Sequence, residues 1–364
     1  MAKELVYLVT GGSGFIGERI VQLLLKQDYV KEVIIFDIYE NESIKHWHTA
    51  SATITFIKGD ITNFNQILAA VKGVHVVIHT AALVDYLDIC PLKKLEAINV
   101  EGTEHVLNAC WAMEVRYILY TSSVSAAGPN TNSHPMARFT EETISEGELL
   151  LSYGKTKARA EQLILLANGR QTSKGDKIVT CAIRASTIYG EKVQHLLDSY
   201  QSAKSKNNQI NYIEPENAEK NYTYVGNVAW MHVLAARQMQ LNPERLGGQM
   251  YYAYDNTPFK KSVKLTHELF TEIDPSIQIG AHIPYWKMWL IVSFYNLMRF
   301  LVRPFWHLKP FMTLPILKLI TTTFYHETDK ASRHFGYRPL YTWVESKHLT
   351  CKWLKHAIHS QQKN

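Results

Sequence analysis

The stretch VTGGSGFIGERI, residues 9–20, constrains the fold of this chain more than any other. An apolar run ends at Thr10, glycines follow at positions 11, 14 and 17, and an amphipathic stretch begins within the same few residues. Glycine loses more conformational entropy on folding than any other residue, so such a cluster marks a place where a side chain would obstruct. A glycine-rich turn between a strand and a helix is typical of dinucleotide-binding folds, in which the helix N-terminus holds the pyrophosphate.

Each glycine of this turn has an expected role. Gly11 permits the tight turn, Gly14 lets the backbone approach a pyrophosphate, and Gly17 lets the helix pack closely on the sheet. Phe15 and Ile16 lie at the same junction, and we assign them to the cofactor site with the glycines.

Short apolar runs recur along the first half of the chain, with helical stretches between them. Continuous apolar strands indicate burial on both faces, and the intervening helices supply the crossovers of a parallel sheet. The pattern predicts an α/β fold with a doubly wound parallel sheet, the Rossmann arrangement. The predicted strands are 5–10, 32–37, 53–60, 74–82, 116–123 and 177–186.

We expect four regions. The NAD-binding domain comes first, and a smaller substrate lobe, to which we assign a strand and two helices, is interleaved with it. An apolar, membrane-associated helical segment comes next. A C-terminal region of helix and turn follows it. Their expected bounds are 1–190, 191–282, 283–325 and 326–364, with the lobe strand at 249–255 and the lobe helices near 226–240 and 261–273.

Asp37 ends the second predicted strand, twenty residues after Gly17. A carboxylate there can accept hydrogen bonds from both ribose hydroxyls of NAD and would repel the extra phosphate of NADP. No Arg or Lys occupies the next seven positions to offset that repulsion. The sequence therefore predicts NAD, although an aspartate can also simply close a strand at the surface.

Two further strand ends are expected at the same edge of the sheet as Asp37, where the cofactor would bind. Asp60, followed by Ile61, ends the third strand, where a carboxylate can accept a hydrogen bond from an adenine amino group. Thr80, Ala81 and Ala82 end the fourth strand and are small enough for a cofactor to lie against their backbone. In isolation, either segment can equally be an ordinary strand end with no role in binding.

Tyr153 and Lys157 are one helical turn apart and so share a helix face, and Ser123 ends the fifth strand. A Tyr with a Lys at i+4 can also be a surface pair, but ligands of open α/β sheets bind outside the carboxyl ends of the strands. A neighbouring ammonium and a positive nicotinamide both favour the phenolate, so Tyr153 is the expected base. Lys157 would lower the pKa of the phenol and hold the nicotinamide ribose, and Ser123 would orient the substrate hydroxyl.

Composition excludes other classes of function. The net charge is +6, but no run of five or more Lys or Arg occurs, which argues against a nucleic-acid-binding arm. The four cysteines are far apart and form no CxxC pair, so neither a metal site nor a disulfide framework is expected. The opening MAKELVYLVTGG leaves no room for a secretory signal.

TGGSGFIG with the Tyr-Lys pair resembles the extended short-chain dehydrogenases, and further motifs resemble the 3β-hydroxysteroid dehydrogenase/Δ5-isomerase family over almost the whole chain. Within that family, KELVYLVTGG, GPNTNSHP and ANGR are most similar to the bile-acid branch, which oxidises C27 sterols. The family motifs are HTAALVD, NVEGTEHVLNAC, YTSSVSAAGPN, VTCAIRASTIYGE, YVGNVAWMHVLAAR and DKASRHFGYRPLYTW.

The resemblance implies oxidation of a sterol 3β-hydroxyl with NAD, followed by a shift of the Δ5 double bond into conjugation. It places Ser123, Tyr153 and Lys157 at the catalytic positions, and Asp255 in a segment linked to isomerisation. The chain departs from the family pattern at Asn256, where steroidogenic members have a second acid. It departs also at Ala185, where the family motif LRP reads IRA, and at Ser125, where the family has a glutamate.

Other functions stay open at this point. A 3β-hydroxysteroid-4-carboxylate dehydrogenase (decarboxylating) shares the fold and catalytic groups. A redox-sensing NAD-binding regulator without turnover would have little use for an intact Ser-Tyr-Lys set, and a nucleotide-sugar epimerase would have none for residues 283–325. The sequence leaves the oligomeric state open, a homodimer included.

Residues 283–325 mix Trp, Phe and Tyr with isolated cations such as Lys287 and Arg299. The uncharged run from Met288 to Met298 is much shorter than the about 20 apolar residues that a spanning helix needs. We therefore expect helices that lie in the membrane interface, although a buried core helix is the alternative. The resemblance implies the endoplasmic reticulum membrane, with the catalytic domain facing the cytosol and membrane lipid and a sterol as partners.

Overall fold

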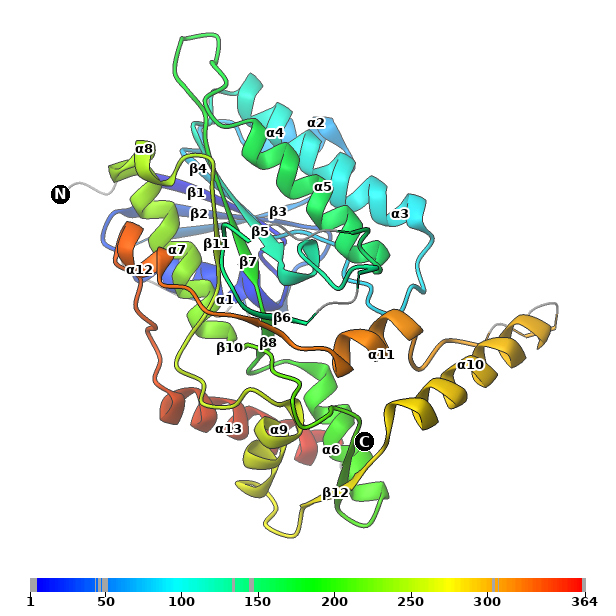
Figure 1. Cartoon of the computed structure of the whole chain (residues 1–364). Coiled ribbons are helices and arrows are strands. Elements are labelled where there is room, and N and C mark those ends of the chain that lie inside the picture. The colour runs from blue at the N-terminus through cyan, green and yellow to red at the C-terminus, as the bar shows by residue number, and fades with distance from the viewer. Residues whose placement is uncertain are drawn as a thin grey trace.

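The computed structural model describes residues 5–42, 44, 47, 52–132, 135–143, 147–302, 305–306 and 308–361. At its centre lies a seven-stranded sheet in the order β11-β7-β5-β4-β1-β2-β3, in which every neighbouring pair is parallel (Figure 1). The order reverses between β1 and β4, which makes their carboxyl ends the expected ligand site. The strands are β1 (Leu5–Thr10), β2 (Val30–Asp37), β3 (Thr53–Lys58), β4 (Val76–His79), β5 (Tyr117–Ser123), β7 (Val179–Ala185) and β11 (Gln249–Tyr252).

Helices cover both faces of the sheet, as the continuous apolar strands predict. On one face α1 (Phe15–Leu24) packs against α7 (Val225–Leu241). On the other face α4 (Gly102–Ala112) packs between α2 (Phe64–Ala70) and α5 (Ser152–Leu166). The predicted doubly wound parallel sheet is confirmed.

The strand and helix that we expected in the lobe at 249–255 and 226–240 belong to the sheet domain instead. β11 pairs in parallel with β7 at the sheet edge, and α7 lies on the sheet beside α1. The physical reason is burial: Tyr251 and Tyr252 are buried on opposite faces of the strand, in two separate core clusters. Residues 191–282 therefore pass from the lobe to the sheet and back.

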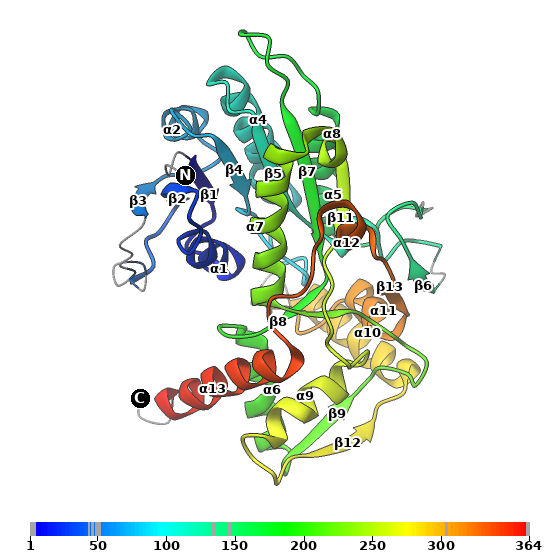
Figure 2. The same ribbon diagram turned by 90° about the vertical axis from the view of Figure 1, so that its left-hand side faces the viewer.

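The smaller lobe lies below the sheet domain in Figure 2. Its core is a separate cluster that includes Leu196, Leu269 and Leu354, one from each of its three helices. These helices are α6 (Gln194–Ser205), α9 (Ser262–Thr271) and α13 (Trp343–Gln361), beside the parallel pair β9 (Gln209–Tyr212) and β12 (Gln278–His282). The remaining elements are the pairs β8 (Thr187–Tyr189) with β10 (Tyr222–Tyr224) and β6 (Met136–Phe139) with β13 (Phe324–His326), a 3-10 turn at Val124–Ala126, and the short helices α3 (Leu92–Glu96), α8 (Pro243–Leu246) and α12 (Lys330–Phe335).

Two helices, α10 (Tyr285–Val302) and α11 (Leu314–Thr321), form an arm, and α10 projects from the body of the protein (Figure 1). Only Met288 and Val292 of α10 are buried, where they pack with Leu317 of α11. The alternative of a buried core helix is therefore wrong. Among the described residues, no helix has both the length and the apolar character needed to cross a membrane. Exposed apolar side chains of α10 are Tyr285, Trp286, Trp289, Leu290, Ile291, Phe294, Leu297, Met298, Phe300 and Leu301.

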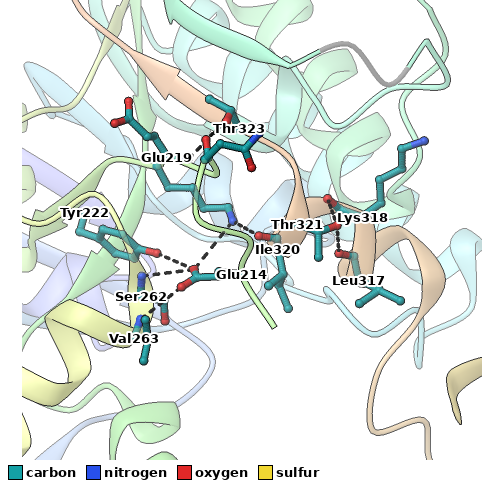
Figure 3. A network of polar contacts seen from close by, with 12 residues as sticks. Glu214, Glu219, Tyr222, Ser262, Val263, Leu317, Lys318, Ile320, Thr321 and Thr323 are labelled. Carbon is teal, nitrogen blue, oxygen red and sulfur yellow. Dashed lines mark hydrogen bonds and ion pairs between the residues drawn. The ribbon is translucent and has the colours of Figure 1, made fainter. Parts of the chain in front are cut away.

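A buried polar network fastens the arm to the lobe (Figure 3). The Glu214 carboxylate accepts hydrogen bonds from the backbone N–H groups of Ser262 and Val263, at the start of α9. Lys220 Nζ lies 4.0 Å from Glu214 Oε1 and donates a 2.6 Å hydrogen bond to the carbonyl of Ile320, near the end of α11. Burial lowers the pKa of Lys220 to about 8, against the opposing effect of Glu214. The Lys220 ammonium and the C-terminus of α11 thus stabilise each other.

Candidate active site

The glycine-rich turn has the geometry of a cofactor cradle. Gly11 has a φ of +68°, and a Cβ on it would lie 2.7 Å from the backbone nitrogen of Ala81. A Cβ on Gly17 would lie 2.1 Å from the carbonyl oxygen of Gly11, so only glycine lets α1 approach the turn. Gly14 precedes α1 without a side-chain cap, which leaves backbone N–H groups for an anion. These features fit a pyrophosphate, with Phe15 and Ile16 in the first helical turn.

Asp37 lies beside this turn. Its carboxylate accepts hydrogen bonds from Ser13 N, at 3.0 Å, and from Ile38 N, at 2.7 Å. Burial raises the pKa of Asp37, and the amide hydrogen bonds partly offset that rise. A carboxylate offers about four acceptor positions, so these contacts leave room for ribose hydroxyls.

The other two predicted strand ends differ from each other. Asp60 is exposed and accepts a hydrogen bond from Thr62 N, whereas the Ile61 side chain is buried in the core, so only its backbone can face a cofactor. Thr80 Oγ1 donates to the carbonyl of Thr10 at 2.7 Å, which holds the end of β4 against the turn. Ala81 and Ala82 follow as half-buried small residues.

Ser123 and Tyr153 lie together at the carboxyl edge of the sheet. Ser123 is the last residue of β5, Tyr153 is the second residue of α5, and each is only 5% exposed. Burial and the nearby Tyr86 raise the pKa of Tyr153, while a hydrogen bond with the Ser123 side chain lowers it. The Ser123 hydroxyl also accepts a 3.1 Å hydrogen bond from Ser125 N. The structure thus brings the predicted base and its orienting hydroxyl into contact.

Lys157 lies in the same buried region, but its contacts differ from those that the spacing predicts. Its ammonium donates a 2.6 Å hydrogen bond to the carbonyl of Thr121 and lies 4.2 Å from the ring centroid of Tyr120. Burial lowers the pKa of Lys157 to about 7, against the effect of Glu161. Within the described part of the chain, no hydrogen bond or ion pair joins Lys157 to Tyr153.

Two further residues of this region were given no role by the sequence analysis, although Asn99 opens the motif NVEGTEHVLNAC. Asn99 is buried and joins the loop after β4 to α5, because its side chain bonds to both backbone groups of Leu83 and to Thr156. It lies in a π-helical turn, Ala97–Glu101, of a kind often found at functional sites. The ring of Tyr86 packs edge-on against Tyr153, with centroids 5.2 Å apart.

Asp255 occupies a different position. Its carboxylate accepts hydrogen bonds from Tyr224 N, Asn227 Nδ2 and Thr257 N, at 2.8, 3.0 and 2.9 Å. These donors tie the segment after β11 to the start of α7. Across the ranges that the structure describes, no hydrogen bond links Asp255 to Ser123, Tyr153 or Lys157.

The described residues contain no cluster of His, Cys, Asp or Glu that could hold a metal ion, and the four cysteines are free thiols. The side chains that the structure brings together at the sheet edge are hydroxyl groups and one ammonium. A phenol and a serine hydroxyl beside a cradle for a dinucleotide can bind an alcohol and remove its proton.

Comparison with solved structures supports the fold alone. A UDP-glucuronic acid 4-epimerase from Bacillus cereus, solved in complex with UDP-glucuronic acid and NAD, is 17% identical with a TM-score of 0.69, and the match covers 97% of this chain and all of that one.

Curated relatives are much closer in sequence. The human 3 beta-hydroxysteroid dehydrogenase type 7 is 39% identical over 364 residues, covering 99% of this chain and 98% of the relative. The 3 beta-hydroxysteroid dehydrogenase/Delta 5-->4-isomerase of vaccinia virus (strain Ankara) is 34% identical over 358 residues, covering 97% and 99%. A family model matches residues 8–281. As its motifs predict, the chain belongs to the 3-beta hydroxysteroid dehydrogenase/isomerase family.

Proposed function

We propose that this protein oxidises the 3β-hydroxyl of a Δ5-sterol to the 3-oxo form with NAD as cofactor. The observation that carries the proposal is the pairing of Ser123 and Tyr153, both buried at the sheet edge beside the glycine-rich turn, where the Ser123 side chain lowers the pKa of Tyr153. Family membership supports the reaction class, and the Asp37 carboxylate supports NAD over NADP.

When bound beside the glycine-rich turn, NAD would supply the acceptor for the hydride that leaves C3 of the sterol. Tyr153 Oη takes the proton of the 3β-hydroxyl as the carbonyl forms. Ser123 Oγ holds the oxygen of that hydroxyl in position for the transfer. Because burial raises the pKa of Tyr153, the phenol needs a positive charge nearby to act as a base. When protonated, Lys157 can supply that charge from within the same buried region, and it holds the Thr121 carbonyl of β5 in place.

The second step, isomerisation of the Δ5 double bond, is assigned to Asp255. Three N–H donors fix the position of this carboxylate, and a carboxylate can take a proton from one ring carbon and return it to another. Asp255→Asn should then oxidise the sterol but accumulate the unconjugated 3-oxo product. Equal loss of both steps would assign Asp255 a structural role at the β10–α7 junction instead.

For the substrate, we propose a C27 sterol, a 7α-hydroxylated cholesterol derivative of bile-acid synthesis. The resemblance of KELVYLVTGG, GPNTNSHP and ANGR to the bile-acid branch supports this proposal, and the 3 beta-hydroxysteroid dehydrogenase type 7 relatives match over nearly the whole chain. The competing activity is the decarboxylating oxidation of a 3β-hydroxysteroid-4-carboxylate. Mass analysis of products from both sterol classes decides between them, because only the second releases carbon dioxide.

The arm supports attachment to a membrane. Phe294 and Phe300 are 65% and 71% exposed on α10, and exposed aromatics mixed with cations favour the interface of a bilayer. A sterol is nearly insoluble in water, so an enzyme at the bilayer surface meets its substrate there. We place the protein at the endoplasmic reticulum membrane with the sheet domain in the cytosol.

A further inference from the structure

A path of buried hydrogen bonds runs from the glycine-rich turn toward α5. It begins at Thr10, the last residue of β1, whose hydroxyl oxygen lies 2.6 Å from Nδ1 of His79. His79 ends β4, and its other ring nitrogen, Nε2, lies 3.0 Å from Oγ1 of Thr103 in α4. Because the order of the sheet reverses between β1 and β4, the path starts where a ligand of an open α/β sheet binds.

The second half of this buried path reaches the predicted base. Thr103 Oγ1 donates a 2.7 Å hydrogen bond to the backbone carbonyl of Asn99, one helical turn earlier. The side-chain amide of Asn99 donates a 3.0 Å hydrogen bond to Thr156 Oγ1, and Thr156 Oγ1 donates in turn to the carbonyl of Tyr153 at 2.8 Å. The five residues whose side chains form the path are at most 1% exposed, so water does not compete for these hydrogen bonds.

The direction of each hydrogen bond follows from the donors and acceptors in the path. A threonine hydroxyl has one hydrogen, and Thr103 gives it to a carbonyl, so Thr103 Oγ1 must accept the hydrogen of His79 Nε2. Burial lowers the pKa of His79 to about 3, so the ring is neutral and its Nδ1 accepts the hydrogen of the Thr10 hydroxyl. Every donor of the path therefore points toward α5, and the path has a single arrangement.

The path ends at the first turns of α5, which carry the base. Leu151 precedes α5 without a side-chain cap, so the hydrogen bond from Thr156 helps to fix this end of the helix. Asn99, which holds Thr156, also binds both backbone groups of Leu83 in the loop after β4. A buried network whose members all have partners makes the groups that it joins rigid.

We propose that Thr103 and Thr156 are positioning residues of the reaction: the path that they complete fixes Tyr153 relative to the turn that would hold the cofactor. The base then lies at a set place relative to the cofactor before the sterol binds. This inference rests on the proposed function.

The first test is kinetic. Thr103→Val and Thr156→Val each remove one hydroxyl and keep the size of the side chain. We expect kcat for the sterol to fall roughly 10- to 100-fold in each variant, the scale of loss that a displacement of about 1 Å can cause, while KM changes little. Thr103→Ser and Thr156→Ser keep the hydroxyl and should retain most of the wild-type kcat.

Thr180→Val is the matched control. The Thr180 hydroxyl is equally buried and donates a 2.6 Å hydrogen bond to the carbonyl of Ile164, toward the far end of α5. This variant should lose thermal stability as the other two valine variants do, but it should keep the wild-type kcat. An equal fall of kcat in Thr180→Val would mean that the losses come from stability alone and would overturn the positioning role.

The double variant Thr103→Val, Thr156→Val tests whether the two threonines act through one path. Its kcat should be close to that of the more impaired single variant, because the second substitution breaks a path that is already broken. Losses of kcat that multiply would mean that the two residues act independently, which would contradict the path.

Backbone hydrogen exchange tests the positioning without sterol or NAD. In Thr103→Val, the amides of the first two turns of α5 should exchange faster than in the wild type, whereas in Thr180→Val they should not. Unchanged exchange there in Thr103→Val, or wild-type kcat in both Thr103→Val and Thr156→Val, would overturn the inference while the proposed function stands. If the wild type oxidises no sterol, the proposed function fails and the positioning role fails with it.

Discussion

Ser13 N donates a hydrogen bond to Asp37 Oδ2 across 3.0 Å, joining the glycine-rich turn to the end of β2. The two residues are 24 positions apart, so this contact exists only because α1 returns the chain to the sheet. The hydrogen bond fixes the Asp37 carboxylate beside the turn that would hold a pyrophosphate. The carboxylate thus lies where the adenosine ribose is expected.

The double variant Asp37→Ala, Ile38→Arg should shift the preference from NAD toward NADP. It removes a charged acceptor of ribose hydroxyls and adds a cation for the extra phosphate at an exposed position. Since hydrogen bonds to charged groups contribute about 1.5–3 kcal/mol, we expect the ratio of kcat/KM for the two cofactors to change by roughly 10- to 100-fold. Glu40→Ala, an exposed carboxylate nearby, is the control. Equal use of both cofactors by the wild type would contradict the role of Asp37.

The buried ammonium of Lys157 should make stability depend on pH. Its pKa falls from 10.5 to about 7 on folding, so between these values the unfolded chain binds a proton that the folded chain lacks. Stability therefore rises with pH across that window, by up to about 1.4 kcal/mol per pH unit for this group. Urea unfolding at pH 7 to 10 should show a smaller slope in Lys157→Met than in the wild type. Identical slopes would mean that Lys157 keeps its proton in the folded protein across this window.

Three buried histidines should make the protein sensitive to acid. Burial lowers the pKa of His79 and His326 to about 3 and that of His232 to about 4. Between pH 6.5 and about 4, the unfolded chain binds protons that the folded chain excludes, so stability falls as pH falls, by up to roughly 4 kcal/mol per pH unit for the three groups. His232→Gln should reduce the slope of stability against pH by about a third, because it removes one of the three imidazoles that bind a proton on unfolding.

The matched control for the acid experiment is His356→Gln, since His356 is exposed on α13. A wild type whose free energy of unfolding stays constant from pH 6.5 to 4.5 would show that the three imidazoles are protonated in the folded state.

The sequence predicts those parts of the fold that local patterns encode. Apolar runs such as 32–37 and 177–186 are strands of the sheet, and the glycine spacing predicts the turn. The position of β11 could not be predicted in this way, because a four-residue strand joins a sheet edge through burial on two faces, not through its own pattern.

The candidate site shows the same division. Ser123 and Tyr153 follow from a strand end and a helix start, whereas the contact of Lys157 with Thr121 O depends on how α5 lies on β5. Tyr86 was missed because nothing in HTAALVDYLD marks a loop tyrosine whose ring packs against Tyr153. Loop conformation, here set by Asp85, decides such contacts.

Replacement of Trp289, Phe294 and Phe300 by Ser should release the protein from membranes. Burial of a large apolar side chain contributes about 1.5–3 kcal/mol, so the partition coefficient onto phosphatidylcholine vesicles should fall at least about 1000-fold. The wild type should resist high salt and be released by detergent. The control replaces Leu166, Leu241 and Val344, exposed apolar residues outside the arm, by Ser and should still bind. A wild type that stays in the supernatant without detergent would contradict the membrane assignment.

The central claim is that Tyr153 is the base of a sterol dehydrogenase, and single-turnover oxidation tests it most directly. Wild type and Tyr153→Phe are mixed with NAD and a 7α-hydroxylated 3β-hydroxy-Δ5-sterol in detergent, and the 3-oxo product is measured by mass. The account predicts that both proteins bind NAD equally and that the variant forms product about 10²- to 10⁴-fold more slowly. Near-normal product formation by Tyr153→Phe, or no 3-oxo product from the wild type, would contradict it.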